Sequence, residues 1–265
     1  MSGNQVTVVS LNTRGVPVMG THLARRYAVI GAELEAGDAD VACLQEVFTW
    51  WHLRLLARRM RSFGHVSYRL APPGPAGGLV TFSRLPVSGT IYRGFGIPPR
   101  AERISRLARY RAGMKGILVS RLVQPGLSIV NTHPVANRDG DWSRGSRFYP
   151  LHRAQLGTLT QALLSIKAPA VVCGDFNVDR DSSLFGEFLV GTGLADAFEG
   201  SCPATFRAEY LPVGKMPHCI DFILTGDGVK AEGGTVLFAG KDPMPGGPGY
   251  VSDHLGLYAR LFLAS

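Results

Sequence analysis

The segment Ala170–Asn177 constrains this chain more than any other stretch, because an apolar run ends there in closely spaced polar residues. Residues 170–173 are apolar, Gly174 follows, and Asp175 and Asn177 stand two positions apart. In an extended chain such residues point to the same face, so both side chains can act on one ligand at the end of a strand. Alone, the pattern would be no more than a strand end with two polar residues.

The same arrangement recurs along the chain at the ends of other apolar runs. Glu46 follows Val41–Leu44, His133 follows Leu127–Asn131, Asp221 stands at the start of Ile220–Leu224, and Asp253 and His254 precede Leu255–Leu263. Five strands thus each carry an acid, an amide or an imidazole at one end. This recurrence predicts a convergent, metal-dependent hydrolytic site.

Length and charge limit the organisation of the chain and its partners. A length of 265 residues, 45% of them hydrophobic, predicts one domain over residues 1–265 with a substantial core. The net charge is +8, and arginines concentrate between Arg54 and Arg61 and between Arg100 and Arg121. Such a balance favours anionic partners, namely nucleic acid, phosphorylated small molecules or acidic lipid surfaces, although an arginine-rich solvated surface explains most single residues.

Cysteine spacing and the N-terminus bear on the compartment. The four cysteines form no zinc-knuckle or redox motif, and Cys43 and Cys173 lie inside apolar runs as small buried residues. No charged-then-apolar leader precedes the first strand, and no apolar run is long enough to span a bilayer. We expect a cytoplasmic monomer without a transmembrane segment; a secreted protein is the alternative if a signal peptide was removed.

Hydrophobic periodicity predicts alternating strands and helices. Helices are expected over residues 21–36, 48–63, 153–166 and 182–192, and strands over 6–11, 41–44, 79–83, 87–93, 116–122, 127–132, 170–173, 220–224, 235–239 and 255–263. The arginine-rich connection 95–114 receives no assignment. Strands dominate and the polar residues lie at their ends, which predicts an α/β layered sandwich that binds its ligand at one edge of the sheets.

Six short segments together resemble the endonuclease/exonuclease/phosphatase superfamily, and they occur in that family's order along nearly the whole chain. They are Val9–Asn12, Leu44–Val47, Asn131–His133, Gly174–Asn177, Ile220–Leu224 and Ser252–His254. The resemblance implies a four-layer sandwich of two packed β-sheets flanked by helices. It also implies hydrolysis of phosphate esters with Mg²⁺, or with Mn²⁺ or another divalent ion in its place.

Phosphoester hydrolysis requires charge neutralisation, an activated water and a protonated leaving group, and these residues can supply all three. Glu46, Asn12 and Asp253 are the expected metal ligands, because Mg²⁺ prefers oxygen donors. The other expected roles are a general base (His254), its orienting carboxylate (Asp221), a group that positions the water or a second metal (Asp175), a donor to the developing phosphoryl charge (Asn177), and an imidazole that stabilises phosphate or protonates the leaving group (His133).

Structural readings stand beside several of these roles. Asn12 could be a turn residue, Asp221 a loop cap and His133 a half-buried structural histidine. Lys115 could contact a phosphate, but a solvated lysine at a strand start is the simpler interpretation. The remaining histidines have no motif around them and are expected to be surface or structural residues: His22, His52, His65, His152 and His218.

Further segments resemble the neutral sphingomyelinase-like branch. They are Asn12–Pro17, Gly78–Val87, Lys115–Gly116 before Asn131–His133, and Arg153–Leu156. Abasic-site nucleases of the superfamily carry an acid where this chain has Arg14, and usually a tyrosine where it has His133. The preferred function is therefore hydrolysis of a phospholipid phosphodiester or a related lipophilic phosphate. The alternatives are a nuclease, a phosphatase of a phosphomonoester or diphosphate metabolite, and a non-enzymatic scaffold on the same fold.

Overall fold

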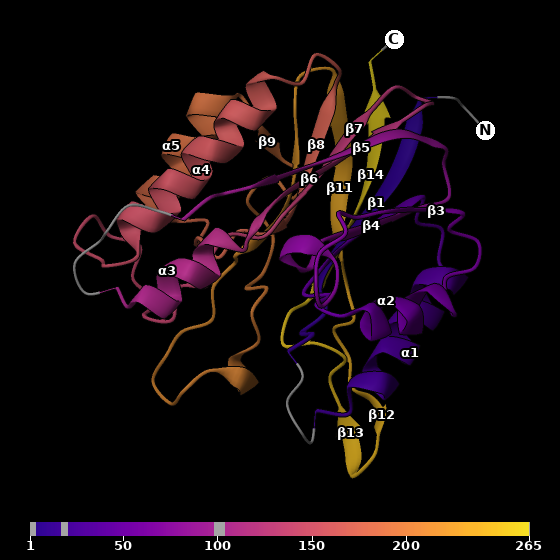
Figure 1. Ribbon diagram of the computed structural model, residues 1–265, viewed down its shortest axis with the longest axis horizontal. Helices are drawn as coiled ribbons and strands as arrows, with labels where there is room; N and C mark the ends of the chain where they lie inside the picture. Colours follow the sequence, from indigo (N-terminus) through magenta and orange to yellow (C-terminus); the bar gives the residue numbers. More distant parts are fainter. Residues whose placement is uncertain (1–3, 17–20, 98–103, 265) are drawn as a thin grey trace.

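The computed structural model describes residues 4–16, 21–97 and 104–264, which form two six-stranded β-sheets with helices on their outer sides (Figure 1). The elements are β1 (Gln5–Asn12), α1 (Leu23–Ala36), β2 (Val41–Gln45), α2 (Trp50–Ala57), β3 (His65–Ser67), η1 (Ala76–Gly78), β4 (Val80–Ser83), β5 (Val87–Gly94), α3 (Arg106–Gly113), β6 (Gly116–Leu122), β7 (Ser128–Thr132), α4 (Tyr149–Leu164), β8 (Ala170–Asp175), α5 (Ser183–Thr192), β9 (Ala195–Asp196), η2 (Ala208–Tyr210), β10 (Asp221–Thr225), β11 (Val229–Leu237), β12 (Asp242–Met244), β13 (Gly247–Gly249) and β14 (Gly256–Leu263).

Each sheet has a parallel strand pair near its centre. The first sheet has the order β11-β14-β1-β2-β4-β3 and the second β5-β6-β7-β8-β10-β9. The pairs β1–β2 and β7–β8 are parallel, and their neighbours in both sheets run antiparallel to them. The carboxyl ends of parallel strands meet at one edge of a sheet, so both sheets bring strand ends to the same end of the molecule.

Alternation along the central strands divides the apolar residues between two cores. On β1, Val6 and Val8 pack with residues of the second sheet, whereas Val9 and Leu11 pack with α1 and α2. Successive side chains of a strand point to opposite faces, so a strand covered on both sides contributes to both cores.

Helices complete the two outer layers. Tyr27 and Ile30 of α1 and Leu56 of α2 cover the first sheet, while Leu159 of α4 and Phe185 of α5 extend the core beyond the second sheet. The two helix pairs lie on opposite sides of the sheets in Figure 1. The predicted four-layer sandwich is therefore confirmed.

Two helix predictions need correction. The helix expected over residues 48–63 is confined to α2, with Thr49 as its N-cap, and the chain turns after Ala57. Met60 and Phe63 remain buried beyond its end, so the apolar spacing reflects burial and not a continued helix. Within the unassigned connection 95–114, α3 forms over Arg106–Gly113.

Smaller differences concern element ends and short strands. The helix α4 begins at Tyr149, four residues before the expected start, with a proline in its first turn, and β11 begins at Val229 instead of residue 235. The short strands β3, β9, β12 and β13 have too few residues for a periodic signal. Pro17, Arg100 and Arg103, which belong to the predicted motifs and basic stretch, lie outside the described residues.

All four cysteines are buried and unpaired, and the burial predicted for Cys43 and Cys173 is confirmed. No helix among residues 4–16, 21–97 and 104–264 combines the length and apolarity needed to cross a membrane.

One of the motif-free histidines is a structural group with a measurable effect. His152 on α4 is fully buried, and its Nε2–H donates to the carbonyl oxygen of Val135 (2.8 Å). Burial lowers its pKa to about 4. In the unfolded chain this histidine has a pKa of about 6.5, so below that pH the unfolded chain binds a proton more readily than the folded protein does. The stabilisation that is present above about pH 6.5 is therefore lost as the pH falls towards 4.

We expect the free energy of unfolding to fall by about 3 kcal/mol from this group between about pH 7 and about pH 4. Urea unfolding of the wild type and of His152→Gln, which keeps a donor for Val135, measures the difference. The variant should show a shallower pH dependence by that amount. Parallel stability profiles would show that another group controls acid unfolding.

Candidate active site

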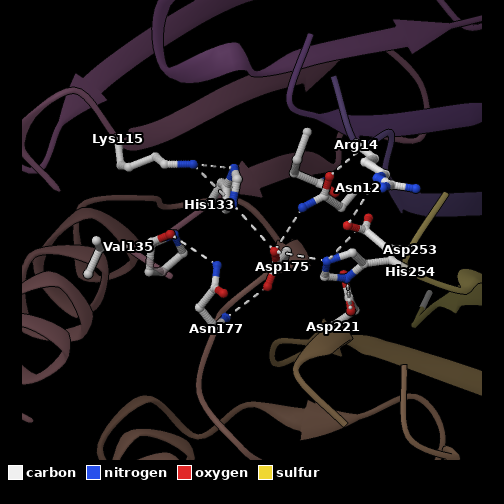
Figure 2. A network of polar contacts seen from close by, with 12 residues as sticks. Asn12, Arg14, Lys115, His133, Val135, Asp175, Asn177, Asp221, Asp253 and His254 are labelled. Carbon is white, nitrogen blue, oxygen red and sulfur yellow. Dashed lines mark hydrogen bonds and ion pairs between the residues drawn. The ribbon is translucent and has the colours of Figure 1, made fainter. Parts of the chain in front are cut away.

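The predicted polar residues other than Glu46 lie close together in Figure 2, at the common end of the two sheets. Asn12 is the last residue of β1, and the parallel register places it beside Gln45, directly before Glu46. In the second sheet, Asp221 opens β10 opposite Asp175, the last residue of β8. These four strands come from both sheets, and His133 directly after β7 and His254 two residues before β14 complete the predicted set.

The backbone around the site adopts uncommon conformations. Glu46 (φ 63°), Asn177 (φ 53°) and Arg14 (φ 50°) all lie in the left-handed region. For a residue with a Cβ this conformation is disfavoured and persists only where surrounding contacts enforce it. These residues directly follow strand ends, where the chain leaves the sheet and turns the side chain towards the site.

Two glycines allow the strand ends to approach. A Cβ at Gly15 would collide with the carbonyl oxygen of Glu46, and a Cβ at Gly174, whose φ is 153°, would collide with the carbonyl oxygen of Thr132. Glycine is required at both positions, because the backbones of neighbouring segments pass too closely for a side chain. The spacing between Glu46 and Asn12 depends on the first of these contacts.

Asp175 is the centre of the polar network. Its Oδ2 accepts a hydrogen bond from Asn12 Nδ2 (2.9 Å) and lies 3.3 Å from His133 Nε2 and 3.8 Å from His254 Nε2. Burial raises the pKa of Asp175, but the charge of His254 and the hydrogen bond from His133 outweigh it and hold the pKa well below its usual range. This carboxylate therefore stays ionised within a buried site.

His254 and Asp221 form a buried pair. His254 Nδ1 lies 2.8 Å from Asp221 Oδ2. The rings of Phe206 and His254 pack in a T-shaped arrangement with 5.0 Å between their centroids. Burial would lower the pKa of His254, but the carboxylates of Asp221 and Asp175 raise it to about 10. A carboxylate on Nδ1 fixes the tautomer and leaves Nε2 facing the site.

His133 is held by partners on both sides. Lys115 Nζ lies 2.9 Å from His133 Nδ1 and 3.1 Å from Nε2, and Nε2 also lies 3.3 Å from Asp175 Oδ2. Burial lowers the pKa of Lys115, against the opposing effect of Glu46 and Asp175. The interpretation of Lys115 as a solvated strand-start residue is therefore wrong, because its ammonium group points inward to the site (Figure 2).

Asn177 is fixed by its surroundings. Its backbone N–H donates to Asp175 Oδ1 (2.9 Å), its carbonyl oxygen accepts from Trp142 Nε1 (2.8 Å), and its Nδ2 donates to the carbonyl oxygen of Pro134 (3.2 Å). One N–H of the amide is thus used by Pro134, which leaves the second for a ligand.

Glu46, Asn12 and Asp253 each carry a side-chain oxygen atom of the kind that can bind a divalent cation. No described residue forms a hydrogen bond or ion pair with the carboxylate of Glu46, which is half-buried. Asn12 Oδ1 accepts one hydrogen bond, from the backbone N–H of Arg14 (2.9 Å), and keeps a second lone pair. Hard cations such as Mg²⁺ take carboxylate and amide oxygens of this kind.

A second arrangement of possible ligands lies deeper in the site. Asp175, Asp221 and His254 each offer one atom, and these atoms lie within 4.8 Å of one another. His254 Nδ1 and Asp221 Oδ2 are already hydrogen-bonded, so these two atoms could bind a cation only at the loss of that bond. Glu46 and Asn12 require no such loss, and we favour them as ligands.

Several further residues contact the site, and no sequence motif predicts these contacts. Arg14 Nε lies 3.5 Å from Asp253 Oδ2, and its guanidinium stacks on Tyr210 at 4.2 Å. Thr205 Oγ1 accepts the backbone N–H of Asp221 (3.1 Å). In the sequence Arg14 is notable only for replacing the acid of the nuclease pattern, and Thr205 and Tyr210 lie in an irregular segment without a motif.

Comparison with known proteins finds a family model and relatives that match nearly the whole chain. The sequence model of the Endonuclease/Exonuclease/phosphatase family matches residues 9–254. Sphingomyelin phosphodiesterase 2 of Homo sapiens is 26% identical over 287 aligned positions, which cover 98% of this chain and 65% of that protein. The chain thus spans somewhat less than two thirds of the length of this relative.

Two solved structures share the fold. Sphingomyelinase C from Streptomyces griseocarneus superimposes with a TM-score of 0.72 at 19% identity, covering 98% of this chain and 99% of that chain. D. rerio TDP2, complexed with a single-strand DNA product, superimposes with a TM-score of 0.70 at 18% identity, covering 97% and 98%. At these identities the likeness establishes a common fold.

Proposed function

The chain belongs to the endonuclease/exonuclease/phosphatase family, and on that basis we propose that it is a phosphoric ester hydrolase that cleaves a phosphodiester of a phospholipid or a related lipophilic phosphate. The observation that carries the proposal is the His254–Asp221 pair, with Nδ1 held at 2.8 Å and Nε2 turned towards Asp175. This is the arrangement of a positioned general base.

In the proposed reaction, water attacks phosphorus and the bond to the leaving alcohol breaks. His254 Nε2 takes the proton of the water, which requires the imidazole to be neutral beforehand, and Asp221 stabilises the imidazolium that forms. The departing oxygen needs a proton, which His133 supplies in this scheme.

Other side chains position the reactants in this scheme. Asp175 orients the attacking water next to His254, while Asn12 Nδ2 and His133 Nε2 hold this carboxylate in place. The free N–H of the Asn177 amide donates to the charge that develops on the phosphoryl oxygens. Lys115, through His133, keeps a positive charge close to the same oxygens.

Glu46, Asn12 and Asp253 would hold Mg²⁺ or Mn²⁺ in this proposal. Such a cation would supply charge neutralisation for the phosphoryl oxygens and would offset the carboxylates that raise the pKa of His254. Arg14 Nε also approaches one of these groups, at 3.5 Å from Asp253 Oδ2.

The preference for a lipid substrate rests on the relatives. Sphingomyelin phosphodiesterase 2 matches nearly the whole chain, and this chain carries Arg14 and His133 where the nuclease pattern differs. A nuclease is the second candidate, because the net charge of +8 suits a phosphate backbone and TDP2 has the same fold.

The test is cleavage of a matched panel with Mg²⁺ and with EDTA, followed by released phosphate or phosphocholine for the lipids and small phosphates and by gel-resolved fragments for the nucleic acids. The panel contains sphingomyelin, a glycerophospholipid, plasmid DNA, single-stranded RNA, an isoprenoid diphosphate and an inositol phosphate. We expect metal-dependent cleavage of a lipid and no cleavage of nucleic acid. Cleavage of nucleic acid alone would replace the lipid assignment by the nuclease.

A further inference from the structure

The helix α3 presents an apolar stripe to solvent beside the candidate active site. Leu107 is 58% exposed, Tyr110 57% and Met114, at the C-cap, 49%. Their spacing of three and four residues places them on one side of a helix. Three large apolar side chains at such exposure on one face are unusual for a surface that contacts only water.

Arginines border this stripe on both sides. At about 100° per residue the three apolar side chains fall within an arc of about 60°, with Arg106 flanking Tyr110 and Arg111 flanking Leu107. No acidic residue occurs between Arg106 and Lys115. Arginine can extend its guanidinium away from an apolar surface while its stem covers that surface.

The opposite side of α3 fixes the helix to the protein. Ala112 is fully buried against Val135 and Leu151, and its carbonyl oxygen accepts a hydrogen bond from Gln155 Nε2 (3.1 Å). The exposed stripe is therefore the side of the helix that stays open to solvent among the described residues, while its other side is already packed.

The position of α3 connects this surface to the site. Met114 directly precedes Lys115, whose Nζ lies 2.9 Å from His133 Nδ1. A surface that binds the stripe would therefore lie next to the segment that carries Lys115 into the site. Figure 1 places α3 at the same end of the molecule as the loops that follow the strands.

We propose that the α3 surface, formed by Arg106, Leu107, Tyr110, Arg111 and Met114, docks on a bilayer that contains anionic lipid. The apolar side chains enter the headgroup region and the two arginines contact lipid phosphates, as in an amphipathic helix that lies in a membrane interface. The inference rests on the proposed function in one respect, because docking there would present a lipid substrate to the site. Leu107 and Met114 favour lipid over single-stranded nucleic acid, which requires planar groups for base stacking.

The test is co-sedimentation of the full chain with phosphatidylcholine vesicles, with and without phosphatidylserine. Replacing both Leu107→Ser and Met114→Ser should lower vesicle affinity by about tenfold or more, because it removes most of the buried apolar area. Replacing both Arg106→Gln and Arg111→Gln should lower affinity by about tenfold for mixed vesicles and by less than about twofold for pure phosphatidylcholine. The control is Leu164→Ser, because Leu164 is 70% exposed at the end of α4.

A second measurement separates this inference from the proposed function. Turnover of a water-soluble nitrophenyl phosphodiester should be the same in all variants, since none of these residues belongs to the site. Loss of vesicle binding in the α3 variants alone supports the inference even if the wild type hydrolyses no lipid, in which case only the proposed function fails. The inference would be overturned if the α3 variants bound vesicles as tightly as the wild type, or if the wild type bound no vesicles. It would also be overturned if the α3 substitutions weakened only the binding of an oligonucleotide.

Discussion

Replacing His254 by alanine should lower turnover by about 10³-fold or more, because it removes the proposed general base. The side chain is buried between Asp221 and Asp175, with Nδ1 2.8 Å from Asp221 Oδ2. Removal of the imidazole leaves two buried carboxylates without their partner, and their charges repel each other more strongly. Metal-dependent turnover on the best substrate of the panel measures the effect.

The controls separate catalysis from folding. Far-ultraviolet circular dichroism and urea unfolding should show a folded His254→Ala variant, and His65→Ala, on the edge strand β3, should keep wild-type turnover. Asp221→Asn keeps the imidazole but removes the charged acceptor of Nδ1–H, so it should also lower turnover, by about 10²-fold or more. Near-wild-type turnover of His254→Ala, with the protein folded, would rule out His254 as the base.

The convergence of polar residues could be predicted from the sequence, because strand geometry is regular. Asn12, Asp175 and Asp221 each lie at the end of an apolar run, and parallel strands bring such ends to one edge. The pairing of His254 with Asp221, 33 positions apart, followed from the family resemblance and is present in the structure.

Contacts between irregular segments could not be predicted. Asn177 donates to Pro134 and Arg14 pairs with Asp253, which lies at the other end of the chain. Neither contact follows from local propensity, since each depends on where two loops leave different strands. The burial of Lys115 has the same origin, because only the folded position of His133 gives its ammonium group a partner.

The helix α3 shows why a short helix lacks a sequence signal. Its eight residues are fewer than an isolated helix needs, and its stability comes from the Ser105 cap and from Ala112 packing on Val135 and Leu151. The exposed apolar residues add to the difficulty, because a pattern search assigns them to the core. The same residues become informative once the structure shows which side of the helix is covered.

The second prediction concerns the metal ligands. Among them, we expect Glu46→Gln to weaken cation binding the most. The carboxylate of Glu46 has no hydrogen-bond or ion-pair partner among the described residues, and its backbone holds a left-handed conformation at φ 63°. An amide has nearly the same shape but lacks the charge, so the variant should bind divalent cations at least about tenfold more weakly and lose most of its turnover at low Mg²⁺.

Two readouts distinguish a metal ligand from a residue with only a structural role. Loss of a structural residue would affect only one of them, whereas loss of a metal ligand should affect both. Calorimetric titration with Mn²⁺ reports cation affinity without any substrate, and the Mg²⁺ dependence of turnover reports the same affinity through activity. Glu187→Gln is the matched control, since Glu187 is an exposed acid that pairs with Arg144 (3.1 Å) on the surface. If the Mg²⁺ activation curve and the Mn²⁺ isotherm of Glu46→Gln both overlay those of the wild type, then Asp175, Asp221 and His254 become the better candidates for the cation site. If Glu46→Gln instead binds cations more weakly while the Asp221–His254 pair stays intact, the metal ligands and the general base are different groups. We expect this result, because the carboxylate of Glu46 has no hydrogen-bond or ion-pair partner among the described residues.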